Sequence, residues 1–332
     1  MTENFVPLGL VGVERQTQEL RRCLHPATRL RKPLHVWIHG GSGTGKTVLA
    51  RFILSEFAQK HRVETAYVCC WQHHTLYKVI EALVDQLKIL RAEPQDTAFK
   101  LEKLERHLEG RPLIVVLDEI DLSSPKDRNS IIYGLCNLGQ TGLICISRKK
   151  EAFFSLDPGA RSRLAPQFIE CQRYSNGELA SVLAVRCELA LDSSSCSAQV
   201  VKKIASLSRG DARIAIQTLR SAVEWAEEAR ASQVAPSDVA QVWHELTQPP
   251  RECILSSLTP DHKMLYDVIR ERREVTSARL RELYLEGCQR LHRKPIATRT
   301  FTKYMSRLIQ CGLVTCERAR VKGQTRLFKP GV

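Results

Sequence analysis

The hydrophobic positions in the first half of the chain follow two alternating patterns. Short, almost continuous apolar runs at 34–38, 65–70, 113–117 and 142–147 are typical of strands that are buried on both faces of a parallel sheet. Before and between them, apolar residues recur with helical spacing at 14–24, 48–57, 76–87 and 96–108. Strands that alternate with helices predict an α/β fold with a doubly wound parallel sheet.

The strand pattern stops after Ser175. Helical spacing then predicts three helices over 176–190, 198–208 and 212–230, and a short one after Pro236. The adjacent Pro249 and Pro250 mark a linker, because proline continues neither a helix nor a central strand. The middle of the chain is therefore predicted to be helical throughout.

The segment after this linker has a third pattern. Three amphipathic helices are predicted over 260–273, 277–291 and 297–310, followed by strands at 313–317 and 326–328 with a basic turn between them. Three helices and a hairpin resemble a winged helix, which is one form of the helix-turn-helix design. The sequence thus predicts three domains, over residues 1–172, 173–250 and 251–332.

The net charge of +14 belongs mostly to the third domain. Residues 258–332 contain 17 basic and 7 acidic residues, whereas the other 257 residues contain 33 and 29. Such a concentration of positive charge indicates a polyanionic partner for the end of the chain. The remainder of the chain is nearly neutral.

The sequence lacks the patterns of a membrane-spanning or secreted protein, and it lacks the cysteine spacing of a protein held together by disulfides or zinc. No apolar run approaches the roughly 20 residues that span a bilayer, and the first ten residues have no signal-peptide pattern. The 12 cysteines include no C-x-x-C pair, so we interpret most of them as buried side chains in a reducing compartment. We predict a cytoplasmic, nucleoid-associated protein with no membrane partner.

The strongest chemical signal follows the first predicted strand. Residues 40–47 read GGSGTGKT and match the phosphate-binding loop G-x-x-x-x-G-K-[ST] between a strand and a helix. Lys46 would reach the β- and γ-phosphates, and the Thr47 hydroxyl would bind Mg²⁺. We predict that ATP or ADP is bound by the loop and the residue after it: Gly40, Gly41, Ser42, Gly43, Thr44, Gly45, Lys46, Thr47 and Val48.

Two adjacent carboxylates, Asp118 and Glu119, end the apolar strand 113–117. Open α/β sheets bind ligands at this end of their strands. Asp118 would hold Mg²⁺ through water, and Glu119 would polarise the attacking water as the general base. Two surface acids at a strand end would be the ordinary interpretation, but the phosphate loop makes the paired site the better one.

These motifs occur in an order that resembles the archaeal replication initiators, which are AAA+ ATPases related to the largest subunit of the origin recognition complex and to its helicase-loading partner. The resemblance covers nearly the whole chain. It rests on the phosphate loop, the Asp-Glu strand, the strand ending at Ser147, Leu-Asp-Pro at 156–158, Ser-Arg-Leu at 162–164, Gly-Asp-Ala-Arg at 210–213 and the winged helix. It implies an AAA+ base, a helical lid with a sensor arginine and a DNA-binding winged helix in the three predicted domains.

The resemblance also implies roles for single residues. Arg213 would be the lid arginine that contacts the γ-phosphate of its own subunit, and Arg163 would be the arginine finger that acts on a neighbouring subunit. Arg161 is the alternative finger. Val11, with Leu8 and Gly12, matches the N-terminal segment that packs on adenine, and an ordinary core contact is equally compatible with Val11.

One residue departs from the family pattern. The family usually ends the Ile-Ser strand with a polar sensor, typically Asn, and this chain has Arg148 there. A cation can still contact the γ-phosphate but does not orient water as an amide does. We therefore predict slow ATP hydrolysis, with ATP acting as a switch.

The basic residues of the third domain gather on its last helix and in the hairpin. Arg299, Thr300, Lys303 and Arg307 lie on or near one face of the helix, opposite an apolar face made by Phe301, Met305, Leu308 and Ile309. Such a helix can contact bases in the major groove, while Arg320, Lys322 and Arg326 of the hairpin suit phosphates or the minor groove. A solvated basic face, or a winged helix used for protein contact, is the alternative.

The resemblance places one further DNA contact in the helical stretch 73–90, where His74, Thr75, Tyr77 and Lys78 could serve. Together these features predict an ATP-dependent replication initiator that binds double-stranded origin DNA and recruits or loads the replicative helicase. Other copies or paralogues of the chain are further predicted partners. Two other functions stay open, namely an AAA+ branch-migration motor and an ATP-switched transcriptional regulator.

Overall fold

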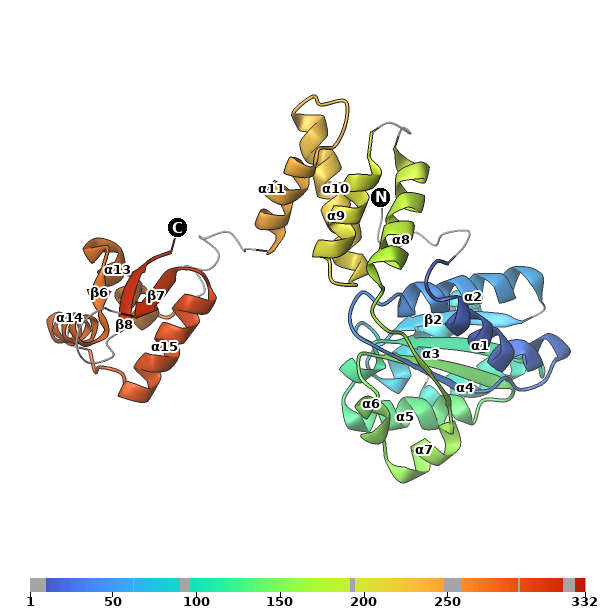
Figure 1. The fold of residues 1–332 in the computed structure, drawn as a ribbon. Coiled ribbons are helices and arrows are strands. Elements are labelled where there is room, and N and C mark those ends of the chain that lie inside the picture. Colours follow the sequence, from blue (N-terminus) through green and yellow to red (C-terminus); the bar gives the residue numbers. More distant parts are fainter. Residues whose placement is uncertain are drawn as a thin grey trace. The chain divides into compact units, whose positions relative to one another are not determined.

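The fold is that of a computed structural model, which describes residues 10–61, 63–89, 96–191, 195–247, 258–291, 293–318 and 326–331 (Figure 1). The chain divides into two compact units between Val242 and Trp243. The first unit holds a layered α/β domain and a helical domain. The second holds a smaller domain of helices and short strands.

A sheet of five parallel strands forms the centre of the first unit. The strands are β1 (Val36–His39), β2 (Glu64–Cys69), β3 (Leu113–Asp118), β4 (Thr141–Ser147) and β5 (Gln167–Glu170), in the order β2-β3-β4-β1-β5. The register pairs Cys69 with Asp118 and His39 with Ser147. The carboxyl ends of β1 to β4 therefore meet at one edge, where functional side chains can converge.

Both faces of the sheet are covered because its side chains alternate between two apolar cores. Trp37, Val115 and Cys145 face one core, and Ile38 and Val116 face the other. Helices α3 (Leu76–Gln86), α4 (Thr97–Leu108) and α5 (Pro125–Cys136) supply the first core, and α1 (Glu14–Leu24) and α2 (Lys46–Lys60) supply the second. Short elements complete the domain: η1 (His25–Arg29), η2 (Ile120–Leu122), α6 (Glu151–Phe154) and α7 (Pro158–Leu164).

Strand β5 and helix α5 lie outside the elements that the hydrophobic pattern predicts. β5 is an edge strand, and only its Ile169 is buried. Its sequence therefore contains no apolar run from which a strand could be predicted. Helix α5 begins behind the cap of Ser124 and buries Ile131, Ile132 and Leu135. The predicted strands β1 to β4 are all present, with ends that differ by one or two residues.

Within the described residues up to 247, the helices after the sheet are α8 (Asn176–Ala190), α9 (Ala198–Leu207), α10 (Ala212–Glu228) and α11 (Pro236–Thr247). Ser175 caps α8 and forms a reciprocal capping box with Glu178, which fixes where the chain leaves the sheet. Leu183, Ile204 and Leu219 belong to the core of this bundle. The predicted all-helical domain is therefore present.

The second unit contains α13 (Pro260–Arg272), β6 (Val275–Thr276), α14 (Ser277–Arg290), α15 (Thr298–Gln310), β7 (Val314–Arg318) and β8 (Arg326–Pro330). Its sheet is antiparallel with the order β6-β8-β7. Leu265, Tyr284 and Leu308 are buried together with Phe328 of the hairpin. This is the winged helix that the sequence predicts, with the additional two-residue strand β6. None of the helices in the described ranges combines the length and the apolar character needed to cross a membrane.

One ionisable residue is buried at the base of the sheet. His35 precedes β1, and its Nδ1 accepts a hydrogen bond of 3.0 Å from the backbone N–H of Leu143. This bond requires an unprotonated Nδ1. Burial, helped by the charge of Lys32, lowers the pKa of His35 from 6.5 to about 4.

The free energy of unfolding is expected to fall as the pH drops from about 6.5 to about 4, because the unfolded chain binds a proton at His35 that the folded chain resists. The full effect is about 3 kcal/mol. Denaturant unfolding of a His35→Gln variant should show a flatter pH dependence in this window, since its side chain does not titrate. The exposed His25 provides the control, and a His25→Gln variant with an equally flattened curve would contradict the assignment.

Candidate functional site

The loop between β1 and α2 has the backbone of a phosphate-binding loop. Helix α2 begins at Lys46, directly after Gly45, whose φ of 82° lies in the left-handed region. A Cβ atom on Gly45 would lie 2.4 Å from the Tyr174 hydroxyl, so glycine is required there. No side chain caps the N–H groups at the start of α2, which leaves this positive helix end open toward an anion.

The Lys46 ammonium group is bound by the loop itself. It donates hydrogen bonds of 2.7 Å to the Gly40 carbonyl and 2.6 Å to the Gly41 carbonyl. Burial lowers the pKa of Lys46, so the fold disfavours this charge unless acceptors surround it. A phosphate oxygen is an acceptor that could take the place of these carbonyls.

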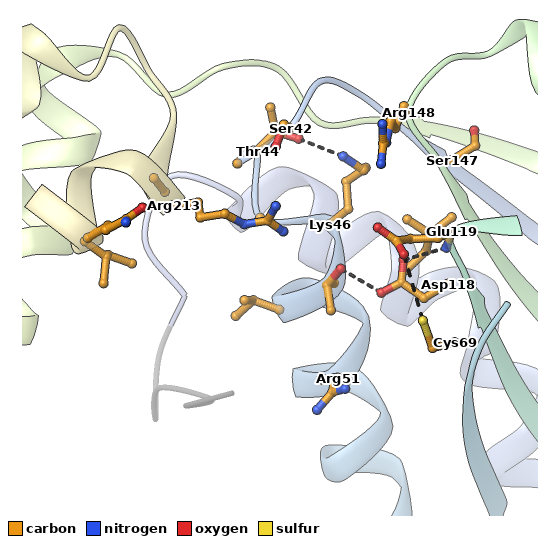
Figure 2. A pocket seen from close by; sticks show the side chains of 18 of the residues that line it. Ser42, Thr44, Lys46, Arg51, Cys69, Asp118, Glu119, Ser147, Arg148 and Arg213 are labelled. Carbon is orange, nitrogen blue, oxygen red and sulfur yellow. Dashed lines mark hydrogen bonds between the residues drawn. The ribbon is translucent and has the colours of Figure 1, made fainter. Parts of the chain in front are cut away.

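Asp118 lies at the end of β3, and its side chain accepts hydrogen bonds on both oxygens. The Thr47 hydroxyl donates to Oδ2 over 2.7 Å, and the backbone N–H of Glu119 donates to Oδ1 over 2.9 Å (Figure 2). The sequence prediction that Thr47 and Asp118 act together therefore corresponds to a direct contact. Tyr67, which the sequence did not indicate, donates a second hydrogen bond of 2.7 Å to Oδ2.

Glu119 stands beside this pair in a left-handed backbone conformation with a φ of 55°. This conformation is unusual for a residue with a side chain and occurs frequently at functional sites. The Cys69 thiol is 3.9 Å from Glu119 Oε2 and is the hydrogen-bonding partner drawn for that carboxylate in Figure 2. Glu119 therefore borders the cavity next to Asp118, as a base that activates water would.

The helical domain formed by α8 to α11, which corresponds to the predicted lid, lines the other side of this cavity. Asp211 caps α10 by accepting the backbone N–H groups of Arg213 and Ile214 over 3.0 and 3.2 Å. The N–H of Ala212 donates to the Gly43 carbonyl over 3.0 Å. A Cβ on Gly43 would lie 1.9 Å from Asp211 Oδ1, so the phosphate loop and the lid touch without room for a side chain. This contact brings Arg213 to the cavity, with its guanidinium turned toward the loop (Figure 2).

The cavity has a volume of about 480 Å³ and a strongly positive lining. Six cationic side chains surround three carboxylates there. The cations are Lys46, Arg51, Arg148, Arg186, Arg213 and Arg220, and the carboxylates are Asp118, Glu119 and Asp121. Of these, Arg51, Arg186 and Arg220 were not predicted from the sequence, because each stands within a helix with no motif around it.

Arg148 reaches the cavity from the end of β4. Its backbone N–H donates to Asp121 Oδ2 over 3.3 Å, and its side chain is exposed. The preceding Ser147 hydroxyl is already engaged, because it accepts from Trp37 Nε1 over 2.9 Å and donates to the Lys149 carbonyl over 2.8 Å. At the end of β4 the cavity is therefore lined by the guanidinium of Arg148, in place of the side-chain amide of the family's usual Asn.

The structure places three predicted site residues outside the lining of this cavity: Arg163, Arg161 and Val11. Arg163, on α7, donates to Asn137 Oδ1 and lies 5.2 Å from the ring centre of Tyr133. Neither Arg163 nor Arg161 lines the cavity, and their role as an arginine finger stays a prediction. Val11 also lies outside the lining, and Leu8 falls outside the described residues.

The residues of the predicted DNA-binding face lie on one side of α15. Arg299, Lys303 and Arg307 are exposed and Thr300 is half-buried, while Phe301, Met305 and Leu308 pack into the core. The His262 ring of α13 stacks on Tyr304 at 3.8 Å and holds the middle of α15. Arg326 is exposed at the start of β8, and Arg320 and Lys322 fall outside the described residues.

The stretch after β2 contains an ordinary core helix. Thr75 caps α3 by accepting the backbone N–H of Lys78, and Val79, Ile80 and Leu83 of α3 are buried against the sheet. His74, Tyr77 and Lys78 are exposed at its start. Their predicted contact with DNA stays a prediction.

Comparison with known proteins gives a consistent family for each part of the chain. Residues 9–146 match the model of an AAA ATPase domain, residues 180–243 that of a Cdc6 AAA+ ATPase-type lid domain, and residues 265–331 that of the CDC6 C-terminal winged helix domain. The chain belongs to the Orc1/Cdc6 family of AAA+ replication initiators. The predicted resemblance and the predicted fold class are thereby confirmed.

Relatives within the family match over most of their length. The chain is 28% identical to ORC1-type DNA replication protein 9 of Halobacterium salinarum over 322 residues, which covers 94% of this chain and 88% of that protein. It is also 28% identical to ORC1-type DNA replication protein 1 of Sulfolobus acidocaldarius, with 98% and 86% covered. The solved structure of the Aeropyrum pernix ORC1 protein in complex with DNA is similar with a TM-score of 0.67 and 25% identity, covering 99% and 92%. The Thermotoga maritima RuvB branch migration motor shares the fold with a TM-score of 0.54 and 20% identity over 95% and 93% of the two chains.

An Asp211→Ala variant should lose the cap of α10 and its contact with the phosphate loop. We expect the free energy of unfolding to fall by about 1 kcal/mol, and the affinity for a fluorescent, non-hydrolysable ATP analogue to fall as well, because Arg213, the predicted γ-phosphate contact, is no longer held at the cavity. The matched control is Asp96→Ala, which removes the cap of α4 outside the cavity lining. Denaturant unfolding and fluorescence titration measure both effects. If the two variants lose nucleotide affinity equally, the contact between lid and loop is not what positions Arg213.

Proposed function

We propose that this protein is an ATP-dependent replication initiator, which binds double-stranded origin DNA with its winged helix and recruits or loads the replicative helicase. The observation that carries the proposal is the cavity in which the phosphate loop, Asp118 and Glu119 of the base meet Arg213 of the lid. The same chain has a winged helix whose last helix exposes a row of cations. The DNA in the related Aeropyrum pernix complex supports the same assignment.

The residues of the cavity fit a nucleotide with a divalent cation. Six cationic side chains and three carboxylates line the cavity, and Arg220 among the cations is already paired with Glu224. Lys46, Arg148 and Arg213 lie beside the phosphate loop and suit a polyanion. The Thr47 hydroxyl and the Asp118 carboxylate are oxygen ligands of the kind that Mg²⁺ prefers, and they lie within hydrogen-bond distance of each other. The cation bound there would neutralise charge on the phosphates.

The chain's own residues then have distinct tasks. Lys46 binds the phosphates, Glu119 accepts a proton from the attacking water, and Arg213 adds positive charge from the lid. Val11 stays a candidate for contact with the base of the nucleotide. Because Arg163 is held by Asn137 and Tyr133, it would have to leave both in order to act on a neighbouring copy of the chain, with Arg161 as the alternative.

Because of Arg148, we propose that the bound nucleotide acts as a conformational switch and is hydrolysed slowly. Its guanidinium can bind the γ-phosphate electrostatically, but it has no acceptor with which to orient water. The direct contact between Gly43 of the loop and the Asp211 segment of the lid supports this role. Occupation of the loop would be transmitted to the lid through this contact while hydrolysis remains slow.

An Arg148→Asn variant is expected to hydrolyse ATP about tenfold faster or more, because an amide can orient the attacking water for Glu119. Steady-state phosphate release by the full chain measures this. Arg22→Asn serves as the control, since Arg22 is exposed and does not line the cavity. Unchanged turnover in Arg148→Asn would mean that Arg148 does not limit hydrolysis.

Binding to duplex DNA should depend on the row of cations on α15. A Lys303→Ala, Arg307→Ala double variant is expected to bind about tenfold more weakly, and each lost phosphate contact should reduce the log–log salt slope by about one unit. Lys263→Ala with Arg270→Ala on α13 removes the same charge from two other exposed positions and is the matched control. Fluorescence anisotropy at several salt concentrations measures both. Salt-independent binding, or equal loss in the two double variants, would argue against this interface.

The same ATPase assay separates the proposal from the alternative of a branch-migration motor. A motor should hydrolyse ATP briskly when duplex or junction DNA is added, whereas a switch should not. A transcriptional regulator would instead be recognised by footprints at promoters across the genome.

A further inference from the structure

The Tyr67 hydroxyl donates to the same oxygen of Asp118 that Thr47 uses. Both O···O distances to Oδ2 are 2.7 Å, while Oδ1 accepts the backbone N–H of Glu119. Asp118 is nearly fully buried, so water has little access to replace any of these donors. The orientation of the carboxylate is therefore set by three donors from three different segments of the chain.

Tyr67 is itself held from several sides. It lies on β2, an edge strand of the sheet, where one side of the backbone would otherwise lack partners. The Gln86 side chain of α3 supplies them, since its Oε1 accepts the Tyr67 N–H over 3.0 Å and its Nε2 donates to the Tyr67 carbonyl over 2.8 Å. The Arg51 guanidinium lies 4.0 Å from the centre of the Tyr67 ring. Both the backbone and the ring are thus held, which places the hydroxyl beside Asp118.

The Tyr67 side chain donates to Asp118 Oδ2 through a neutral hydroxyl. A neutral O–H group beside a carboxylate can stabilise the charge on that carboxylate without competing as a cation for the same oxygen atoms.

We infer that Tyr67 is a positioning residue, whose hydroxyl holds the Asp118 carboxylate in the orientation that binds the divalent cation accompanying the nucleotide. This inference rests on the metal-binding role of Thr47 and Asp118 in the proposed function. A ligating carboxylate commonly depends on such a neighbour, and loss of the neighbour weakens metal binding about 10- to 100-fold. In this inference Tyr67 acts through Asp118.

The test is a Tyr67→Phe variant of the full chain, which removes the hydroxyl and keeps the ring beneath Arg51. The affinity for a fluorescent ADP analogue is measured in EDTA and over a titration with Mg²⁺. We expect the half-saturating Mg²⁺ concentration to rise about tenfold, while the affinity in EDTA stays within about twofold. A purely structural role would instead lower both affinities together.

The chain offers a matched control in Tyr133→Phe. The Tyr133 hydroxyl also donates to an aspartate over 2.7 Å, Asp157 Oδ1, but neither residue lines the cavity. This variant removes the same kind of hydrogen bond, and its Mg²⁺ titration should match that of the unaltered protein. Equal shifts in the two tyrosine variants would overturn the inference.

An Asp118→Asn background separates this inference from the proposed function. If Asp118 binds the cation, Asp118→Asn should largely abolish the effect of Mg²⁺ on ADP affinity, and Tyr67→Phe should add nothing in that background. If Asp118→Asn abolishes the Mg²⁺ effect but Tyr67→Phe alone leaves it unchanged, only the role of Tyr67 is wrong. If Asp118→Asn leaves the Mg²⁺ effect intact, the metal site of the proposed function is wrong, and the inference about Tyr67 is overturned with it.

Discussion

The Asp118 carboxylate is buried at the end of β3, an apolar strand of the sheet. The arrangement of the α/β domain around it depends on which groups donate hydrogen bonds to this carboxylate. An unpaired buried carboxylate would cost several kcal/mol, so its oxygens require donors. These come from Thr47 after the phosphate loop, from Tyr67 on the neighbouring strand and from the backbone of Glu119. The parallel register, which pairs Cys69 with Asp118, places Tyr67 two residues back from the end of β2, within reach of the carboxylate. One buried charge thus ties β2, β3 and the start of α2 to the same point.

A second contact ties the lid to that point. The phosphate loop approaches the first turn of α10 so closely that Gly43 leaves no room for a Cβ beside the Asp211 carboxylate. Asp211 caps α10 by accepting the backbone N–H groups of Arg213 and Ile214. It thereby also fixes the position of the Arg213 backbone. The lid and the loop meet through one backbone hydrogen bond, from Ala212 to Gly43, and through the close approach of the Asp211 carboxylate to Gly43. In the proposed function, phosphates bound by the loop would act on this end of α10 through these contacts.

The sequence predicted those parts of the molecule whose signal is contained in neighbouring residues. Strands β1, β3 and β4 are buried on both faces and are nearly continuous apolar runs, and the phosphate loop, Asp118 and Glu119 lie in short contiguous motifs. The edge strand β5 buries only Ile169 and gives no such signal. Tyr67, Arg51 and Arg186 reach the cavity through strand register and helix packing, which join residues far apart in the chain. Helical spacing also predicted the exposed and buried faces of α15 correctly, because one period fixes both.

The charge on α15 has an energetic consequence within the winged helix. Arg299, Lys303 and Arg307 succeed one another at intervals of four, so neighbouring cations face each other along the helix, and α15 contains no acidic residue to separate them. On α14, by contrast, Arg279 is paired with Glu282 and Glu286. Like charges at this spacing destabilise a helix by a few tenths of a kcal/mol per pair, and the buried contacts of Phe301, Met305 and Leu308 outweigh that cost in the free protein. In the proposed function a polyanion bound along this face would remove the repulsion, which would link the stability of α15 to the affinity for that polyanion through the same three side chains.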